Sequence, residues 1–190
     1  MRFQRFRDTA GFSLIEVLVV AGVASVVMAT AVLIMPGAVR DARSDGAMTV
    51  VASELRRAKD LAVTERRDME VRFVAPNEIQ IWRQEIPLTA GMTKISSVHL
   101  ENNMQFVLMP GLPDTPDGFG NGSAIEFDDA PALFFRTEGI FTDANANLDS
   151  LNGTVFLGVP NQPLTARAVT VFGPTALIRS FRWTGQQWFE

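Results

Sequence analysis

A long uncharged segment near the N-terminus constrains this chain more than any other feature. Residues 17–35 carry no charge, and their only polar side chains are Ser25 and Thr30. Wound as an α-helix, this stretch is roughly 28 Å long, close to the hydrocarbon thickness of a bilayer, about 30 Å. The sequence therefore predicts a membrane-spanning helix, which we assign to residues 12–36.

One carboxylate, that of Glu16, lies at the N-terminal edge of this apolar segment. An ionised group beside hydrocarbon is costly, so such a residue usually serves a function. Residues 11–17 read Gly-Phe-Ser-Leu-Ile-Glu-Val, and a short leader with Arg2, Arg5 and Arg7 precedes them. Arginines before an apolar segment place the N-terminus in the cytoplasm. The prediction is a single-pass protein whose C-terminal domain lies on the side of the membrane opposite the cytoplasm.

This N-terminus resembles that of type IV prepilins and of the pseudopilins of type II secretion. The resemblance implies that a prepilin peptidase removes residues 1–11 by cutting between Gly11 and Phe12, that Phe12 is then N-methylated, and that Glu16 is needed for assembly. It further implies a bacterial inner-membrane protein in contact with lipid, with other pilins or pseudopilins and with an inner-membrane assembly platform. The methylated amine stays cationic, so amine and carboxylate would each lower the cost of burying the other in lipid.

Two alternatives remain at this point. The segment is also compatible with a plain single-pass anchor, in which Glu16 lies among the lipid headgroups. A secretory signal cut after Ala29-Thr30-Ala31 satisfies the small-residue rule for cleavage. However, the apolar stretch continues beyond that tripeptide, and Glu16 has no role in such a signal.

The remainder of the chain, residues 37–190, has the length of one periplasmic domain. Pro36-Gly37 predicts a kink or local break as the helix leaves the membrane. An amphipathic helix is expected over residues 38–67, where apolar side chains recur every three or four positions. That apolar stripe consists of Met48, Val51, Ala52, Leu55, Ala58 and Ala62. The charged side chains on the other faces are expected to meet solvent or a neighbouring subunit.

From residue 69 onward the apolar period changes from about 3.6 to two. Residues 69–75 and 79–81 alternate around the turn signal Pro76-Asn77, which predicts a hairpin. Further strands are expected at 94–100, 104–109, 124–127, 132–136, 154–159, 167–172 and 177–184, separated by turn-rich stretches. The predicted fold class is therefore α+β: a long N-terminal helix packed on antiparallel β-sheets over residues 69–190, pilin-like in arrangement.

Three later segments narrow the resemblance to the H-type pseudopilins and FimT-type pilins. They are the helix end at 53–63 leading directly into a strand, the Phe-x-x-x-Gly segment from Phe135 to Gly139, and the terminal hairpin around Gly173. This family often has Gly-Arg in that last turn, whereas this chain has Gly173-Pro174. The resemblance implies a minor pseudopilin of a type II secretion system. The alternative is a minor pilin of a type IV pilus, with a role in DNA uptake.

Composition argues against catalysis and against nucleic acid. The chain has no cysteine and one histidine, His99, so no nucleophile–base pair or common metal site can be assembled around it. Gly118 begins a glycine-rich loop that lacks the Lys-Ser/Thr of a phosphate-binding motif. We expect a non-enzymatic protein without cofactor or metal. Beyond residue 36 there are 14 basic and 19 acidic side chains, and this acidic balance repels DNA.

Two polar constellations offer alternatives. Oxygen-bearing side chains alternate from Asp143 to Asp149, as in the first half of a calcium loop, but Leu148 stands where that loop needs glycine. A polar connecting loop is the preferred interpretation. Arg179 and Arg182 lie among C-terminal tryptophans, a combination that can hold DNA. Packing of the tryptophans in the core and solvation of the arginines is preferred.

Overall fold

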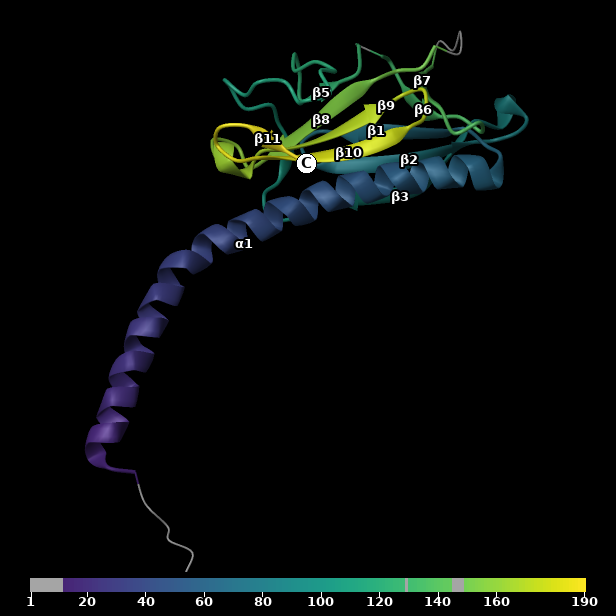
Figure 1. Cartoon of the computed structure of the whole chain (residues 1–190). Helices are drawn as coiled ribbons and strands as arrows, with labels where there is room; N and C mark the ends of the chain where they lie inside the picture. Colours follow the sequence, from purple (N-terminus) through teal and green to yellow (C-terminus); the bar gives the residue numbers. More distant parts are fainter. Residues whose placement is uncertain (1–11, 129, 145–148) are drawn as a thin grey trace, which may run out of the picture. The chain divides into compact units, whose positions relative to one another are not determined.

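The computed structural model describes residues 12–128, 130–144 and 149–190, with residues 31–34 described by their backbone alone. A single helix, α1 (Leu14–Glu65), covers both the expected membrane segment and the expected amphipathic helix. The chain divides into two compact units, Met1–Val39 and Arg40–Glu190. The first contains the apolar part of α1, and the second contains the rest of the helix with all the strands (Figure 1).

The apolar part of α1 has the length and composition of a membrane-spanning segment only when two helical segments are taken together. No single described helix is long and apolar enough by itself to cross a membrane, whereas Leu14–Thr30 and Met35–Glu65 pass the same test together across a break. Pro36 lies inside α1, directly after Met35, where the second of these segments begins. A proline ring clashes with the carbonyl four residues earlier, so the break falls where Pro36 predicts it.

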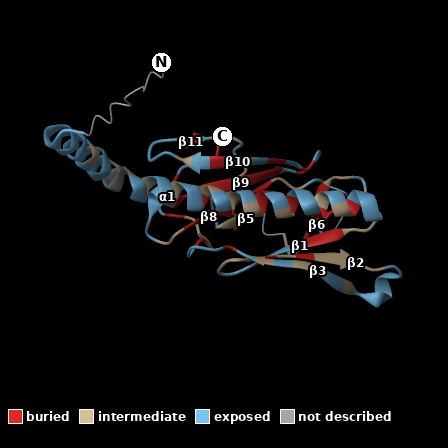
Figure 2. Ribbon diagram, turned by 90° about the horizontal axis from the view of Figure 1, so that it is seen from below, coloured by how far each residue is buried: buried red, intermediate tan, exposed pale blue. Residues whose placement is uncertain are grey.

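The second part of α1 packs through the apolar stripe that the sequence predicts. Val51, Leu55 and Ala62 are fully buried. Ala47 is buried in place of Met48, which is only partly buried, so the stripe begins one residue earlier than expected. In Figure 2 this part of the helix lies across both sheets, with β9 and β10 on one side of it and β1–β3 on the other.

The charged face of α1 is largely exposed, as expected, and two of its basic side chains also reach the β-rich part of the domain. Lys59 Nζ donates hydrogen bonds to the carbonyl oxygens of Thr175, at 2.8 Å, and Ala176, at 3.3 Å. On the opposite side, Arg57 Nη1 donates to Ser96 Oγ at 3.2 Å. These two basic side chains therefore link the helix to the turn between β9 and β10 on one side and to β3 on the other, in addition to the apolar stripe.

Five antiparallel strands form the first sheet, in the order β3-β2-β1-β6-β7. The predicted hairpin is β1 (Met69–Val74) with β2 (Glu78–Gln84), joined across the turn at Pro76-Asn77. The other members are β3 (Met92–His99), β6 (Leu133–Phe135) and β7 (Phe141–Asp143). A short 3₁₀ helix (Leu88–Ala90) connects β2 to β3.

The second sheet has the order β11-β10-β9-β8-β4, and β5 also pairs with β8. Its central strands are β8 (Gly153–Gly158), β9 (Arg167–Phe172) and β10 (Leu177–Trp183). The flanking strands are β4 (Gln105–Phe106), β5 (Ile125–Glu126) and β11 (Trp188–Phe189), and a 3₁₀ helix (Pro163–Thr165) lies between β8 and β9. The α+β class expected from the sequence, a long helix on antiparallel sheets, is confirmed.

The central strands β8 and β9 of the second sheet are buried on both faces. On one face, Val155, Val169 and Val171 join the main core with α1 and the first sheet. On the other face, a second apolar cluster gathers around Phe156, Phe181 and Trp188 together with Met109 and Leu112 from the loop beyond β4. Because both faces are covered, the residues of β8 are buried without alternation.

One predicted strand needs correction, and two observed strands were not predicted. The strand expected at 104–109 is only two residues long, because the chain then leaves the sheet edge to cover the second cluster. The strands β7 and β11 lie in stretches assigned to loops or left unassigned. Both are too short to show a period, and each is recruited by a neighbouring strand: β7 pairs with β6, and β11 pairs with β10.

Candidate functional site: the start of the long helix

The candidate site lies at the N-terminal end of α1. Phe12 and Glu16 are among the described residues, whereas Gly11, the residue expected before the cleaved bond, lies outside them. The helix begins at Leu14, so Glu16 occupies its first turn. A carboxylate in the first turn is favourable because the N-terminal end of a helix carries a partial positive charge.

Ser13 caps this helix. The backbone N–H of Glu16 donates to both Ser13 Oγ, at 3.3 Å, and Ser13 O, at 3.1 Å. Ser13 and Glu16 have the spacing of a capping box, Ser-x-x-Glu, in which serine accepts a bond from the third residue after it. Sequence reasoning missed Ser13, although this spacing was the available signal. The cap fixes where the helix starts and so places Glu16 in its first turn.

Glu16 lies among apolar residues, and its carboxylate has no partner among the described residues of this chain. Glu16 is the one ionisable residue between Phe12 and Val39. Among the described residues, its carboxylate has no hydrogen-bond or ion-pair partner. Phe12 is 82% exposed, and Leu14, Ile15 and the valines that follow are also exposed. So much apolar surface next to one carboxylate fits an environment of lipid or other helices rather than water.

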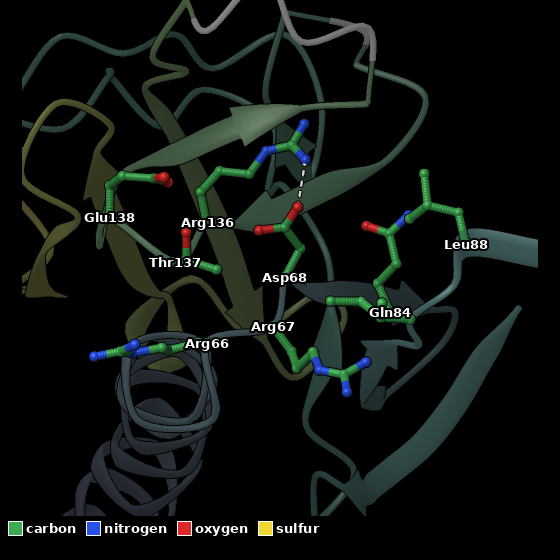
Figure 3. Close-up of a pocket in the computed structure, with 9 residues that line it drawn as sticks. Arg66, Arg67, Asp68, Gln84, Leu88, Arg136, Thr137 and Glu138 are labelled. Atoms are coloured by element: carbon green, nitrogen blue, oxygen red, sulfur yellow. Dashed lines mark hydrogen bonds and ion pairs between the residues drawn. The ribbon is translucent and has the colours of Figure 1, made fainter. Parts of the chain in front are cut away.

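A pocket of about 270 Å³ lies where α1 ends, lined by Arg66, Arg67, Asp68, Gln84, Ile86, Leu88, Arg136, Thr137 and Glu138 (Figure 3). Three arginines in one pocket would suit an anion. However, Arg136 Nη1 binds Asp68 at 2.7 Å and its Nε donates to Thr142, so this guanidinium serves the fold. Figure 3 shows Arg66 and Arg67 pointing away from each other. The arginines therefore do not converge on one ligand.

The structure describes only part of the loop that resembles a calcium site in the sequence. Residues 145–148 of the calcium-type loop lie outside the described residues, so that interpretation stays a prediction. Within the described ranges, no group of three or more His, Cys, Asp or Glu side chains is placed to hold a metal. His99 lies at the end of β3 with an exposed ring, as an ordinary strand residue.

The C-terminal aromatic and basic residues have separate structural environments. Trp188 is buried, and its Nε1 donates to the carbonyl of Pro113 at 2.9 Å, which confirms the expected core position. Trp183 packs edge-on against it. Arg182 is exposed, as expected, but Arg179 is ion-paired to Asp117 at 2.7 Å. No joint basic and aromatic surface results from these four residues.

Comparison with known proteins bears on the N-terminal segment. Residues 6–32 match the family description "Prokaryotic N-terminal methylation motif". The chain therefore carries the N-terminal signal of type IV pilin-like proteins. This confirms the resemblance drawn from the leader, Phe12 and Glu16.

Beyond this segment the comparisons are weak. No curated protein matches the chain. Two solved structures of the minor pseudopilin EpsH from the type II secretion system of Vibrio cholerae are similar to it. One shows 14% identity over 74% of this chain and 97% of EpsH, with a TM-score of 0.49, and the other shows 15% identity over 74% and 94%, with a TM-score of 0.46. At these values the likeness carries no argument about function.

Proposed function

We propose that this chain is a minor pseudopilin of a type II secretion system, a structural subunit of the short periplasmic filament used in protein export. The observation that carries the proposal is the methylation motif over residues 6–32, with Glu16 in the first turn of an otherwise uncharged helical segment. The role we propose is architectural; within the described residues, no group of three or more His, Cys, Asp or Glu side chains is placed to hold a metal.

In this proposal the leader is cut between Gly11 and Phe12 on the cytoplasmic side of the inner membrane. The new amine at Phe12 becomes N-methylated, and the apolar part of α1 anchors the mature subunit until assembly. Within the filament, Glu16 of one subunit faces the cationic amine of another, and the apolar helix surfaces pack together. The pairing is favourable because each charge would otherwise lie alone in a low-dielectric surrounding.

Processing is tested by mass spectrometry of the full chain expressed with and without its prepilin peptidase. We expect the peptidase to remove residues 1–11 and the product to begin with N-methyl-phenylalanine. An identical mass in the two strains contradicts the proposal, and so does a mature protein that begins beyond Ala31.

Assembly and the choice of machine are tested with Glu16→Gln and, as a matched control within the same apolar segment, Ser25→Ala. Ser25 Oγ donates only to the carbonyl of Ala21 in its own helix. We expect Glu16→Gln to be processed normally but to abolish protein export, whereas Ser25→Ala exports normally. If the Glu16 variant exports normally but loses surface pili or DNA uptake, the chain is instead a minor pilin of a type IV pilus.

A further inference from the structure

We propose that Arg167 is a buried latch, by which we mean a side chain that holds residues 41–45 of α1 against the second sheet. Its side chain is 0% exposed, and Arg167 is the one buried arginine among the described residues. The latch matters for a subunit that is pulled by its apolar helix, and in that respect the inference rests on the proposed function. Its structural basis is independent of that function.

The guanidinium of Arg167 joins the helix to the start of β9. Its Nε donates to Asp45 Oδ1 at 2.6 Å, and its Nη2 reaches the carbonyl of Asp41 at 3.5 Å. On the sheet side, its Nη1 donates to the carbonyl oxygens of Ala166, at 2.9 Å, and Leu164, at 3.3 Å. The same group is therefore bonded to both partners across the helix–sheet contact.

The backbone of Arg167 cannot move easily. In the ladder it lies opposite Leu157 of β8 on one side and Arg182 of β10 on the other, so it is held from both sides in the middle of the second sheet. The carboxylate of Asp45, by contrast, is 40% exposed on the helix. Arg167 is thus held in place by the sheet, whereas the carboxylate of Asp45 is the partner that can separate from it.

Apolar packing is weakest where the latch lies. Leu55 and Val51 bury large side chains further along α1, but near Asp45 the buried side chains are those of Ser44 and Ala47. Burial free energy scales with apolar area, so these small side chains contribute little. A pull that arrives through the chain at Val39 loads the helix from this end first. The ion pair, together with the partly buried Met48 and Val50, then resists peeling before Val51 is reached.

The test is hydrogen exchange with mass spectrometry on the full chain in detergent, comparing Asp45→Ala with Asp41→Ala. The control is matched because the Asp41 side chain pairs with Arg40, and only its backbone carbonyl approaches Arg167. We expect Asp45→Ala to raise exchange over residues 40–50 by about tenfold, as local opening would, without changing exchange over residues 55–65 or β8. Asp41→Ala should change neither region.

Equal exchange over residues 40–50 in Asp45→Ala and in the parent chain would overturn the latch. Loss of protection over residues 40–50 and β8 together would also overturn it, because that result describes global stability rather than a local fastening. Asp45→Glu, which keeps the charge, should restore most of the protection. A failure of leader processing would count against the proposed function but would leave these exchange results unaffected.

Discussion

Asp117 Oδ1 lies 2.7 Å from Nη1 of Arg179, and Oδ2 of the same carboxylate accepts a hydrogen bond from Thr170 Oγ1 at 2.6 Å. Asp117 belongs to the long loop after β4, whereas its two partners lie on β10 and β9. This one side chain therefore ties the loop to the second sheet. It also forms an ion pair with Arg179, which the sequence alone left as a candidate for binding DNA.

Replacing Asp117 by alanine should lower the free energy of unfolding by about 1–3 kcal/mol, because the buried Thr170 hydroxyl and the Arg179 guanidinium lose their acceptor. Urea denaturation of the full chain in detergent measures the change. Glu190→Ala is the control, since this exposed carboxylate approaches Arg179 only to 4.0 Å. We expect the control to lie within about 0.5 kcal/mol of the parent chain. Equal effects of the two substitutions would contradict the assigned role of Asp117.

Two glycines should respond to alanine in opposite directions. A Cβ at Gly153 would lie 2.3 Å from the carbonyl oxygen of Glu126, so Gly153→Ala forces backbone apart and should cost about 1–3 kcal/mol or more. Gly46 lies within α1 with no atom in reach of a Cβ, and Gly46→Ala should add about 0.5–1 kcal/mol. Thermal denaturation of both variants checks the signs. A stabilising Gly153→Ala would show that β8 and β5 are not as closely apposed as described.

The helix–sheet contact should be most sensitive at its centre. Leu55 is fully buried in the main core, and Leu55→Ala removes its methyl groups and leaves a cavity, which typically costs about 2–5 kcal/mol. Val63 lies on the same helix but is exposed, so Val63→Ala should stay within about 0.5 kcal/mol. Chemical denaturation compares the two. Similar effects would mean that the helix does not pack through the face that buries Leu55.

Acidification should weaken the domain through two carboxylates, that of Glu78 at the start of β2 and that of Glu85 directly after β2. The Arg83 guanidinium, chiefly by its hydrogen bond, lowers the pKa of Glu85 below its ordinary value, and the Ser97 hydroxyl does the same for the pKa of Glu78. A lowered pKa in the folded state stabilises the fold above the unfolded-state pKa, about 4.3. That contribution disappears as the pH falls through the lower folded-state pKa.

The unfolding free energy should therefore decline below about pH 4, and Glu85→Gln should make the decline shallower. Denaturation midpoints measured from pH 3 to pH 7 test this expectation. The contribution is that of half-buried surface groups, so added salt should diminish it. An unchanged slope in the Glu85 variant would assign the acid sensitivity to other carboxylates.

The sequence by itself determined the features that depend on local periodicity and local chemistry. The uncharged run around Ser25, the carboxylate of Glu16 and the stripe through Leu55 each follow from the spacing of neighbours along the chain, as does the hairpin turn at Pro76. Such features are readable because a helix or a strand repeats its side-chain directions at a fixed interval. The N-terminal signal is readable for the same reason, since its parts lie within a few residues of one another.

Only the tertiary structure decided which distant residues meet. Arg167 and Asp45 are 122 positions apart, and Asp117 is 53 from Thr170, so no spacing rule connects them. Nor does any period mark β7 or β11, two short strands that are held by pairing with β6 and β10 respectively. These contacts exist only in the packed structure, where a buried charge is tolerated because a charged or hydrogen-bonding partner lies beside it.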